Sequence, residues 1–115
     1  MKNVESVLSV KFISTHSYEK LMNICEADLE IFRNVPGLMQ KYYVVEEATG
    51  ALSGFYVFKN KNAKEAFWNS ALAASIPARY GVDLATLRVE HFEMAIVMND
   101  VVMAWLKEQQ KMQDR

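Results

Sequence analysis

The chain has 115 residues, with 13 lysines and arginines against 14 aspartates and glutamates, and a pI near 6.1. This balance, without a basic cluster, argues against a nucleic-acid partner, and a single cysteine, Cys25, excludes an intrachain disulfide framework. No apolar run approaches the ~20 residues of a membrane span, and the first residues do not resemble a signal peptide, so we expect one cytoplasmic domain with no membrane partner.

A strand and a helix are predicted for the first third of the chain. Residues 7–13 alternate apolar and polar side chains, as a half-buried strand does. From Ser17, a favourable N-cap, apolar residues recur at helical spacing. They are Leu21, Cys25, Leu29 and Phe32. Pro36 and Gly37 then predict that this helix ends near Asn34.

An antiparallel hairpin is predicted in the middle of the chain. Residues 38–47 and 51–58 have strand composition, and only a short turn around Thr49 and Gly50 separates them. The register of the two strands does not follow from the sequence.

A second helix and a fourth strand are predicted after the hairpin. Asn62 and Glu65 resemble a capping box that begins the helix, and Pro77 is expected to end it. Residues 87–97 form the fourth strand. Beyond it, residues 99–115 are predicted to form a short amphipathic helix and a polar tail.

The predicted order of elements, βαββαβ, indicates the fold class. It predicts an α+β domain over residues 1–98, in which a four-stranded antiparallel sheet carries both helices on one face, the ferredoxin-like arrangement. Every strand offers apolar side chains at both parities, so the second face needs a cover as well. We therefore predict a homodimer whose two sheets pack face to face around a barrel-like interior.

Few side chains are suited to chemistry. His91, in the last strand, could exchange a proton near neutral pH, whereas His16 lies among polar loop residues and is expected to be solvated. A phenol can donate to a developing oxyanion while its ring packs on a planar substrate, which makes three tyrosines substrate-binding candidates. They are Tyr42, Tyr43 and Tyr56. Trp68 is a candidate pocket wall. A purely structural role is the alternative for each of these residues.

The remaining charged residues favour surface roles. Lys41 is interpreted as a solvated charge that guards an edge strand. Arg79 and Arg88 could meet an anionic group or form surface ion pairs with Asp83 or Glu90. Because the two histidines and Cys25 stand apart in the sequence, no metal site is predicted.

Several motifs occur together along the chain: Pro36-Gly37-Leu38, Lys41, Gly54-Phe55-Tyr56-Val57-Phe58, Ala66-Phe67 and Gly81-Val82. In this combination they resemble a known family, the small YdhR-type monooxygenases of the dimeric α+β barrel superfamily. The resemblance covers roughly residues 4–99. The family pattern often has Trp where this chain has Gln40 and Tyr43. The resemblance implies a homodimer that oxygenates an aromatic or hydroquinone-like molecule without metal or flavin.

The function predicted on this basis is that of a cofactor-independent monooxygenase, with His91 as the base and a small aromatic substrate in a barrel pocket. Three alternatives stay open. The first is a non-catalytic binding module for a small apolar metabolite. The second is a haem-binding or haem-degrading relative, which needs an axial histidine that faces the cavity. The third is a structural dimerisation domain whose interior is filled by its own side chains.

Overall fold

A computed structural model describes residues 5–98 of the chain. The elements follow in the order β1 (Ser6–Phe12), α1 (Tyr18–Ala27), α2 (Leu29–Arg33), β2 (Leu38–Val45), β3 (Leu52–Phe58), α3 (Lys61–Trp68), α4 (Ala71–Arg79), the 3-10 turn η1 (Leu84–Thr86) and β4 (Arg88–Glu93). The strands form one antiparallel sheet in the order β2-β3-β1-β4. This confirms the predicted α+β, ferredoxin-like fold. The predicted C-terminal segment, residues 99–115, lies outside the described residues.

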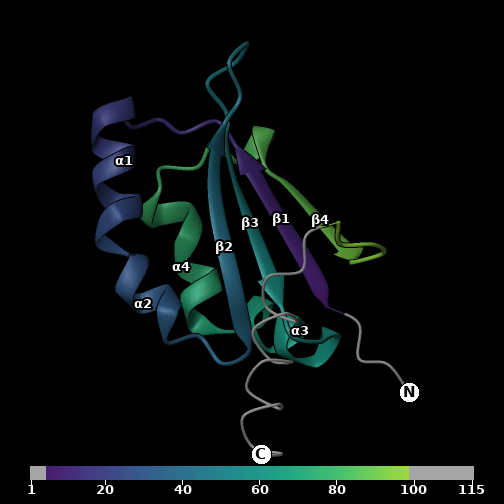
Figure 1. Ribbon diagram of the computed structural model, residues 1–115. Coiled ribbons are helices and arrows are strands. Elements are labelled where there is room, and N and C mark those ends of the chain that lie inside the picture. The colour runs from purple at the N-terminus through teal and green to yellow at the C-terminus, as the bar shows by residue number, and fades with distance from the viewer. Residues whose placement is uncertain (1–4, 99–115) are drawn as a thin grey trace, which may run out of the picture.

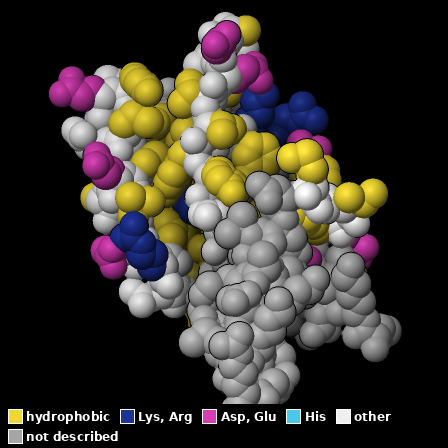
Figure 2. Space-filling view, viewed as in Figure 1, with side chains coloured by type: hydrophobic (Ala, Val, Ile, Leu, Met, Phe, Trp, Pro, Cys, Tyr) yellow, Lys and Arg dark blue, Asp and Glu magenta, His cyan; other side chains and the backbone are white. Residues whose placement is uncertain are grey.

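The helices α1, α2 and α4 lie on one side of the sheet (Figure 1). The core fills the space between the two layers and includes Leu8, Val10 and Phe12 of β1 and Tyr56 and Phe58 of β3, all almost completely buried. On the other face no helix from the described part of the chain covers the strands, and apolar side chains are exposed there. Figure 2 shows hydrophobic side chains over much of the surface turned to the viewer. None of the described helices is long and apolar enough to span a membrane.

Both predicted helices are in fact broken into two. The first is interrupted at Asp28, between α1 and α2. The second begins earlier than predicted, because the side chain of Asn60, rather than Asn62, accepts the backbone N–H of Ala63. Ser70 caps its second half, α4, in the same way.

Pro77 lies inside α4 instead of ending it, which corrects the prediction. A proline removes only its own N–H from the helical ladder, and the next turn still forms because the N–H of Tyr80 donates to the carbonyl of Ile76 at 2.9 Å. The helix therefore continues to Arg79.

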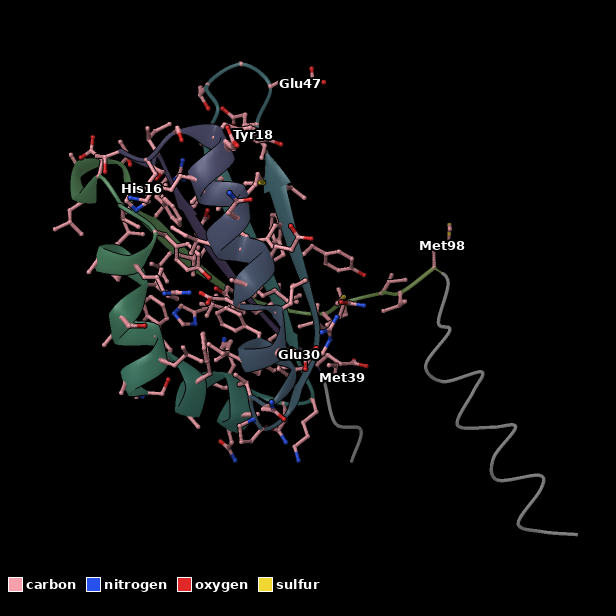
Figure 3. All side chains as sticks on the ribbon, turned by 90° about the vertical axis from the view of Figure 1, so that its left-hand side faces the viewer. His16, Tyr18, Glu30, Met39, Glu47 and Met98 are labelled. Carbon is pink, nitrogen blue, oxygen red and sulfur yellow. The ribbon has the colours of Figure 1, made fainter. Side chains whose placement is uncertain are left out.

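The last strand, β4, is shorter than the predicted residues 87–97. Its partner β1 begins at Ser6, which pairs with Glu93, so the strand ends where the pairing ends. Residues further along are exposed, as Met98 shows at the far end of the described chain (Figure 3).

The register places four residues in one row across the helix-covered face. Lys41 of β2 pairs with Tyr56, Tyr56 pairs with Leu8, and Leu8 pairs with His91 of β4. A β-bulge between Leu38 and Gln40 shifts the alternation at the start of β2. Strict alternation would place Met39 on the same face as Lys41. Because of the bulge it does not apply here, and Met39 is exposed.

Candidate functional site

Lys41 lies on the edge strand β2, but its side chain points toward the helices. Its Nζ atom lies 3.2 Å from the centroid of the Phe32 ring, 4.1 Å from that of Tyr43 and 4.4 Å from that of Tyr56. The prediction of a solvated edge charge is therefore wrong. The reason is that α2 carries Phe32 across this edge of the sheet, so that the edge is covered by a helix and needs no charged guard.

The protonation state of Lys41 is set mainly by its burial. Burial lowers the pKa of Lys41 to about 7, against the opposing influence of the negative charges that Cys25 and Asp28 can carry. The aromatic faces around Nζ favour the ammonium form. None of the ion pairs found among residues 5–98 includes Lys41. The amine and ammonium forms therefore coexist near neutral pH.

A chain of hydrogen bonds leads from Lys41 into the protein. Lys41 Nζ donates to the hydroxyl of Tyr43 at 2.7 Å, the hydroxyls of Tyr43 and Tyr80 lie 3.4 Å apart, and Tyr80 donates to Oδ2 of Asp28 at 2.8 Å. Burial raises the pKa of Tyr43 to about 12 and raises that of Tyr80 as well. Both phenols are therefore protonated at neutral pH and can act as hydrogen-bond donors.

The carboxylate of Asp28 anchors this chain. Asp28 is only 2% exposed, and it accepts two hydrogen bonds from Arg79, at 2.7 Å from Nε and 2.5 Å from Nη2. These bonds from Arg79, followed by the bond from Tyr80, lower the pKa of the carboxyl group. Of the two alternatives considered for the arginines, the surface pairing with Asp83 or Glu90 does not hold for Arg79, whereas Arg88 does pair with Glu90, at 3.9 Å. Because α4 continues past Pro77, Arg79 reaches the junction of α1 and α2 instead.

Lys41 is one of the residues that line a cavity of about 250 Å³ between α2 and the beginning of β2. The residues that line it are Leu29, Phe32, Arg33, Leu38, Met39, Gln40 and Lys41. Figure 3 shows this end of the molecule, where Glu30 of α2 lies near Met39 of β2. The lining combines aliphatic and aromatic walls with a few polar groups, as small-molecule sites do.

Two further spaces border the same region. An apolar groove of about 400 Å³ lies on the other side of α2. It is lined by Ile31, Asn34, Val35, Pro36, Ala66, Phe67, Ser70 and Leu72. Deeper in the core, the space beside Gly54, Tyr43 and Tyr80 amounts to only about 10 Å³, so the interior between the sheet and α4 is filled by side chains.

The predicted site residues fall into three separate places. Tyr43 and Tyr56 surround Lys41, as described above. His91 and Trp68 meet at the opposite edge of the sheet, edge to face with 6.5 Å between their ring centroids. Tyr42 lies on the uncovered face and is 55% exposed. In the described part of the chain, neither histidine is among the residues that line the cavities. His16 instead contacts the carbonyl of Arg79.

Sequence reasoning did not single out Lys41, Tyr80 or Asp28 as site residues. One signal was available: Lys41 shares its parity with Tyr43, so an inward tyrosine in β2 requires an inward lysine. Nothing in the sequence pattern indicates the contact of Asp28 with Tyr80, which are 52 residues apart.

Comparisons with solved structures give the same fold in several bacterial proteins. Protein SO0527 from Shewanella oneidensis is 14% identical with a TM-score of 0.67, over 84% of this chain and 96% of that one. SnoaB from Streptomyces nogalater, a cofactor-independent oxygenase, is 11% identical with a TM-score of 0.60, over 84% and 96% of the two chains. A monooxygenase from the gene ActVA-Orf6 of Streptomyces coelicolor, crystallised with nanaomycin D, is 14% identical with a TM-score of 0.62, over 84% and 92%.

Neither a protein-family model nor a curated protein matches the sequence. At these identities the structural likeness shows a shared fold alone, one that is also found in an oxygenase and in a monooxygenase. It does not carry over the activity, because one fold hosts many functions.

Proposed function

We propose that the chain is a cofactor-independent monooxygenase that acts on a small aromatic or hydroquinone-like molecule in the cavity beside Lys41. The observation that carries this proposal is an amine that can be neutral near pH 7 and that borders an aromatic and aliphatic cavity. The oxygenases among the proteins of the same fold support the choice of reaction.

The reaction requires a base and little else from the protein. Neutral Lys41 would take a proton from a hydroxyl, or from an acidic ring carbon, of the substrate, and the electron-rich anion would reduce molecular oxygen. When a ring methylene is oxidised to a carbonyl, the substrate provides all four electrons, one oxygen atom enters the product and the other leaves as water. No external reductant is needed.

Two groups around Lys41 have matching roles. The hydroxyl of Tyr43 is held at 2.7 Å from Nζ and can donate a hydrogen bond to an oxyanion that replaces the amine as its partner. The side chain of Phe32 contributes an apolar group to the cavity wall, which suits an aromatic substrate. These contacts would bind the anion in a site of low dielectric constant, where each hydrogen bond is stronger than in water.

The same proposal includes a homodimer closed through the uncovered face of the sheet. That face carries the apolar side chains of Val7, Tyr42, Phe55, Val57 and Phe92, of which Tyr42 and Phe92 are 55% and 46% exposed. Contiguous apolar surface of this kind is typical of a protein interface. A second copy would bring the same patch, as a two-fold interface requires.

The filled interior favours one alternative, a structural dimerisation domain. The core space of about 10 Å³ beside Tyr43 and Tyr80 holds no substrate, so catalysis depends on the cavity at the edge of the sheet. A non-catalytic binding module would use that same cavity. The haem-binding alternative calls for a histidine in a cavity and would give a Soret band on haem titration.

Oxygen uptake by the purified protein tests the proposal. The protein is treated with a metal chelator and offered a panel of hydroquinones and anthrones, with heat-denatured protein and buffer as controls. We expect uptake above both controls for at least one compound that also binds. Binding without uptake across the panel would contradict an oxygenase and favour the binding module.

A further inference from the structure

We propose that the amine of Lys41 is also a covalent capture site for small apolar aldehydes, with which it forms an imine inside the cavity between α2 and β2. This inference concerns a different reaction from the oxygenation proposed above and does not depend on it. It assigns a nucleophilic role to an amine that three aromatic rings surround and whose lysine lines a cavity.

Lys41 lies in the wall of the cavity. Its Nζ atom is surrounded by the rings of Phe32, Tyr43 and Tyr56. The hydroxyl of Tyr43 is the hydrogen-bond partner that the structure gives to this amine. An aldehyde that enters the 250 Å³ cavity therefore contacts a lysine whose nitrogen is held in place and is not engaged by any ion pair of the described residues.

The step balances without a further reactant. The lone pair of Nζ forms a bond to the carbonyl carbon, the carbonyl π pair moves to oxygen, and proton transfer from nitrogen to oxygen gives a carbinolamine. The hydroxyl of Tyr43, which is protonated at neutral pH, can donate a proton to the departing hydroxyl group and then take one back from the iminium nitrogen. Water leaves as the C=N bond forms, so one amine and one aldehyde give one imine and one water.

The chemistry of the cavity selects the ligand class. Leu29, Phe32, Leu38 and Met39 form apolar walls, and Arg33 and Gln40 add polar groups. Such a lining suits an aldehyde with a ring or a short alkyl chain. A hydrated aldehyde such as glyoxylate gains nothing from these walls and is the matched comparison compound.

Burial supports the choice of this lysine over the others. With its pKa near 7 against 10.5 for an ordinary lysine, Lys41 has a neutral fraction at pH 7 about a thousandfold larger than a solvated lysine has. A less basic amine is also an intrinsically weaker nucleophile, so the net preference is smaller. We expect imine formation at Lys41 to be roughly tenfold faster than at a solvated lysine.

The test is reductive trapping on the full chain. The protein is incubated with benzaldehyde and sodium cyanoborohydride at pH 7, and the alkylated lysines are identified by peptide mass spectrometry at increasing times. Lys20 and Lys59, both exposed, serve as internal references. We expect benzyl addition at Lys41 to be roughly tenfold faster than at either reference, and this preference to be smaller when glyoxylate, which the apolar walls do not favour, replaces benzaldehyde.

Two variants sharpen the result. Tyr43→Phe should slow the trapping at Lys41 while leaving Lys20 and Lys59 unchanged, and Lys59→Arg should leave the rate at Lys41 as it is. Labelling of Lys41 no faster than that of the two exposed lysines in the wild-type protein would overturn the inference, and this measurement requires no variant to fold. Selective trapping without oxygen uptake would support the aldehyde site and contradict the oxygenase. Oxygen uptake without selective trapping would support the oxygenase and contradict the aldehyde site.

Discussion

Lys41 and His91 lie at opposite ends of one row of paired residues on the helix-covered face of the sheet, with Tyr56 and Leu8 between them. Three inter-strand spacings of about 4.8 Å separate them by about 14 Å, so the two side chains cannot act on the same atom of a small substrate. Lys41 borders the cavity, whereas His91 is exposed beside Trp68. We therefore assign the role of general base to Lys41. Substitutions at the two ends of the row should then have different effects.

Replacing the proposed base should abolish turnover. Lys41→Met keeps an unbranched side chain of similar length but no amine, and loss of a general base typically lowers the rate by about 10²–10⁴-fold. His91→Ala should retain oxygen uptake close to that of the wild type. Uptake measured on both variants distinguishes the two bases: loss in His91→Ala with retention in Lys41→Met would return the role to His91.

The stability of the protein should rise with pH between about 7 and 10.5 through Lys41. The folded pKa is lowered to about 7, so in this window the unfolded state binds more protons than the folded state, and raising the pH favours folding. Below pH 7 the lysine is protonated in both states and the slope disappears. Lys41→Met removes this contribution.

Urea denaturation at pH 7, 8 and 9 measures this slope. The free energy of unfolding of the wild type minus that of Lys41→Met should increase as the pH rises. Comparing the two proteins cancels the contributions of groups that Lys41 does not influence. Buried Cys25, whose pKa is raised to about 11, interacts with Lys41 but acts in the opposite sense and only above pH 9. A constant difference across the three pH values would contradict a lowered pKa of Lys41.

The carboxylate of Asp28 should be a main stabilising contact between α4 and the α1–α2 junction. Asp28→Ala removes the acceptor of the buried Tyr80 hydroxyl and of Arg79, and we expect a loss of about 1–3 kcal/mol in the free energy of unfolding. Because its folded pKa is depressed, Asp28 stabilises the fold above pH 3.8 and loses that effect as the pH falls below it. Glu30→Ala, which breaks an exposed pair with Arg33, is the matched control and should change stability by less than about 0.5 kcal/mol. Equal effects of the two substitutions would contradict this role.

Lysine substitutions at Val57 and Phe58 should separate dimerisation from folding. Val57 lies on the uncovered face, whereas Phe58 is fully buried under the helices. Val57→Lys should give a folded monomer, because a charge in the proposed sheet-to-sheet interface lacks a partner, and Phe58→Lys should not fold. Light scattering and circular dichroism report the two outcomes. A stable dimer of Val57→Lys would exclude an interface on this face.

The fold could be read from the sequence because its signals are local. Pro36 and Gly37 end the first helix, the short turn at Thr49 and Gly50 joins the hairpin, and alternation marks the strands. Element boundaries were less certain where two caps compete, as for Asn60 and Asn62, or where a proline such as Pro77 is tolerated within a helix.

The site could be predicted only in part, because it depends on contacts between distant segments. Tyr43 and Tyr56 were named as candidates and do surround the same lysine. The environment of Lys41 was missed, since it requires Phe32 of α2 to cover the edge of the sheet, which no pattern within β2 reveals. The anchor of Asp28 on Arg79 likewise follows only once α4 is known to extend past Pro77.

The measurement that tests the account most directly is the titration of Lys41 itself. Lysine labelled with ¹³C at Cε and ¹⁵N at Nζ allows each amine to be followed by NMR between pH 5 and 11, and comparison with Lys41→Arg assigns the resonance. We predict that one lysine resonance, absent from the variant, titrates near pH 7, well below the ordinary value of a lysine side chain. If Lys41 instead titrates near the ordinary lysine value of about 10.4, its amine is protonated at neutral pH and is not available as a base or nucleophile. That result would contradict both the proposed oxygenase and the proposed aldehyde site.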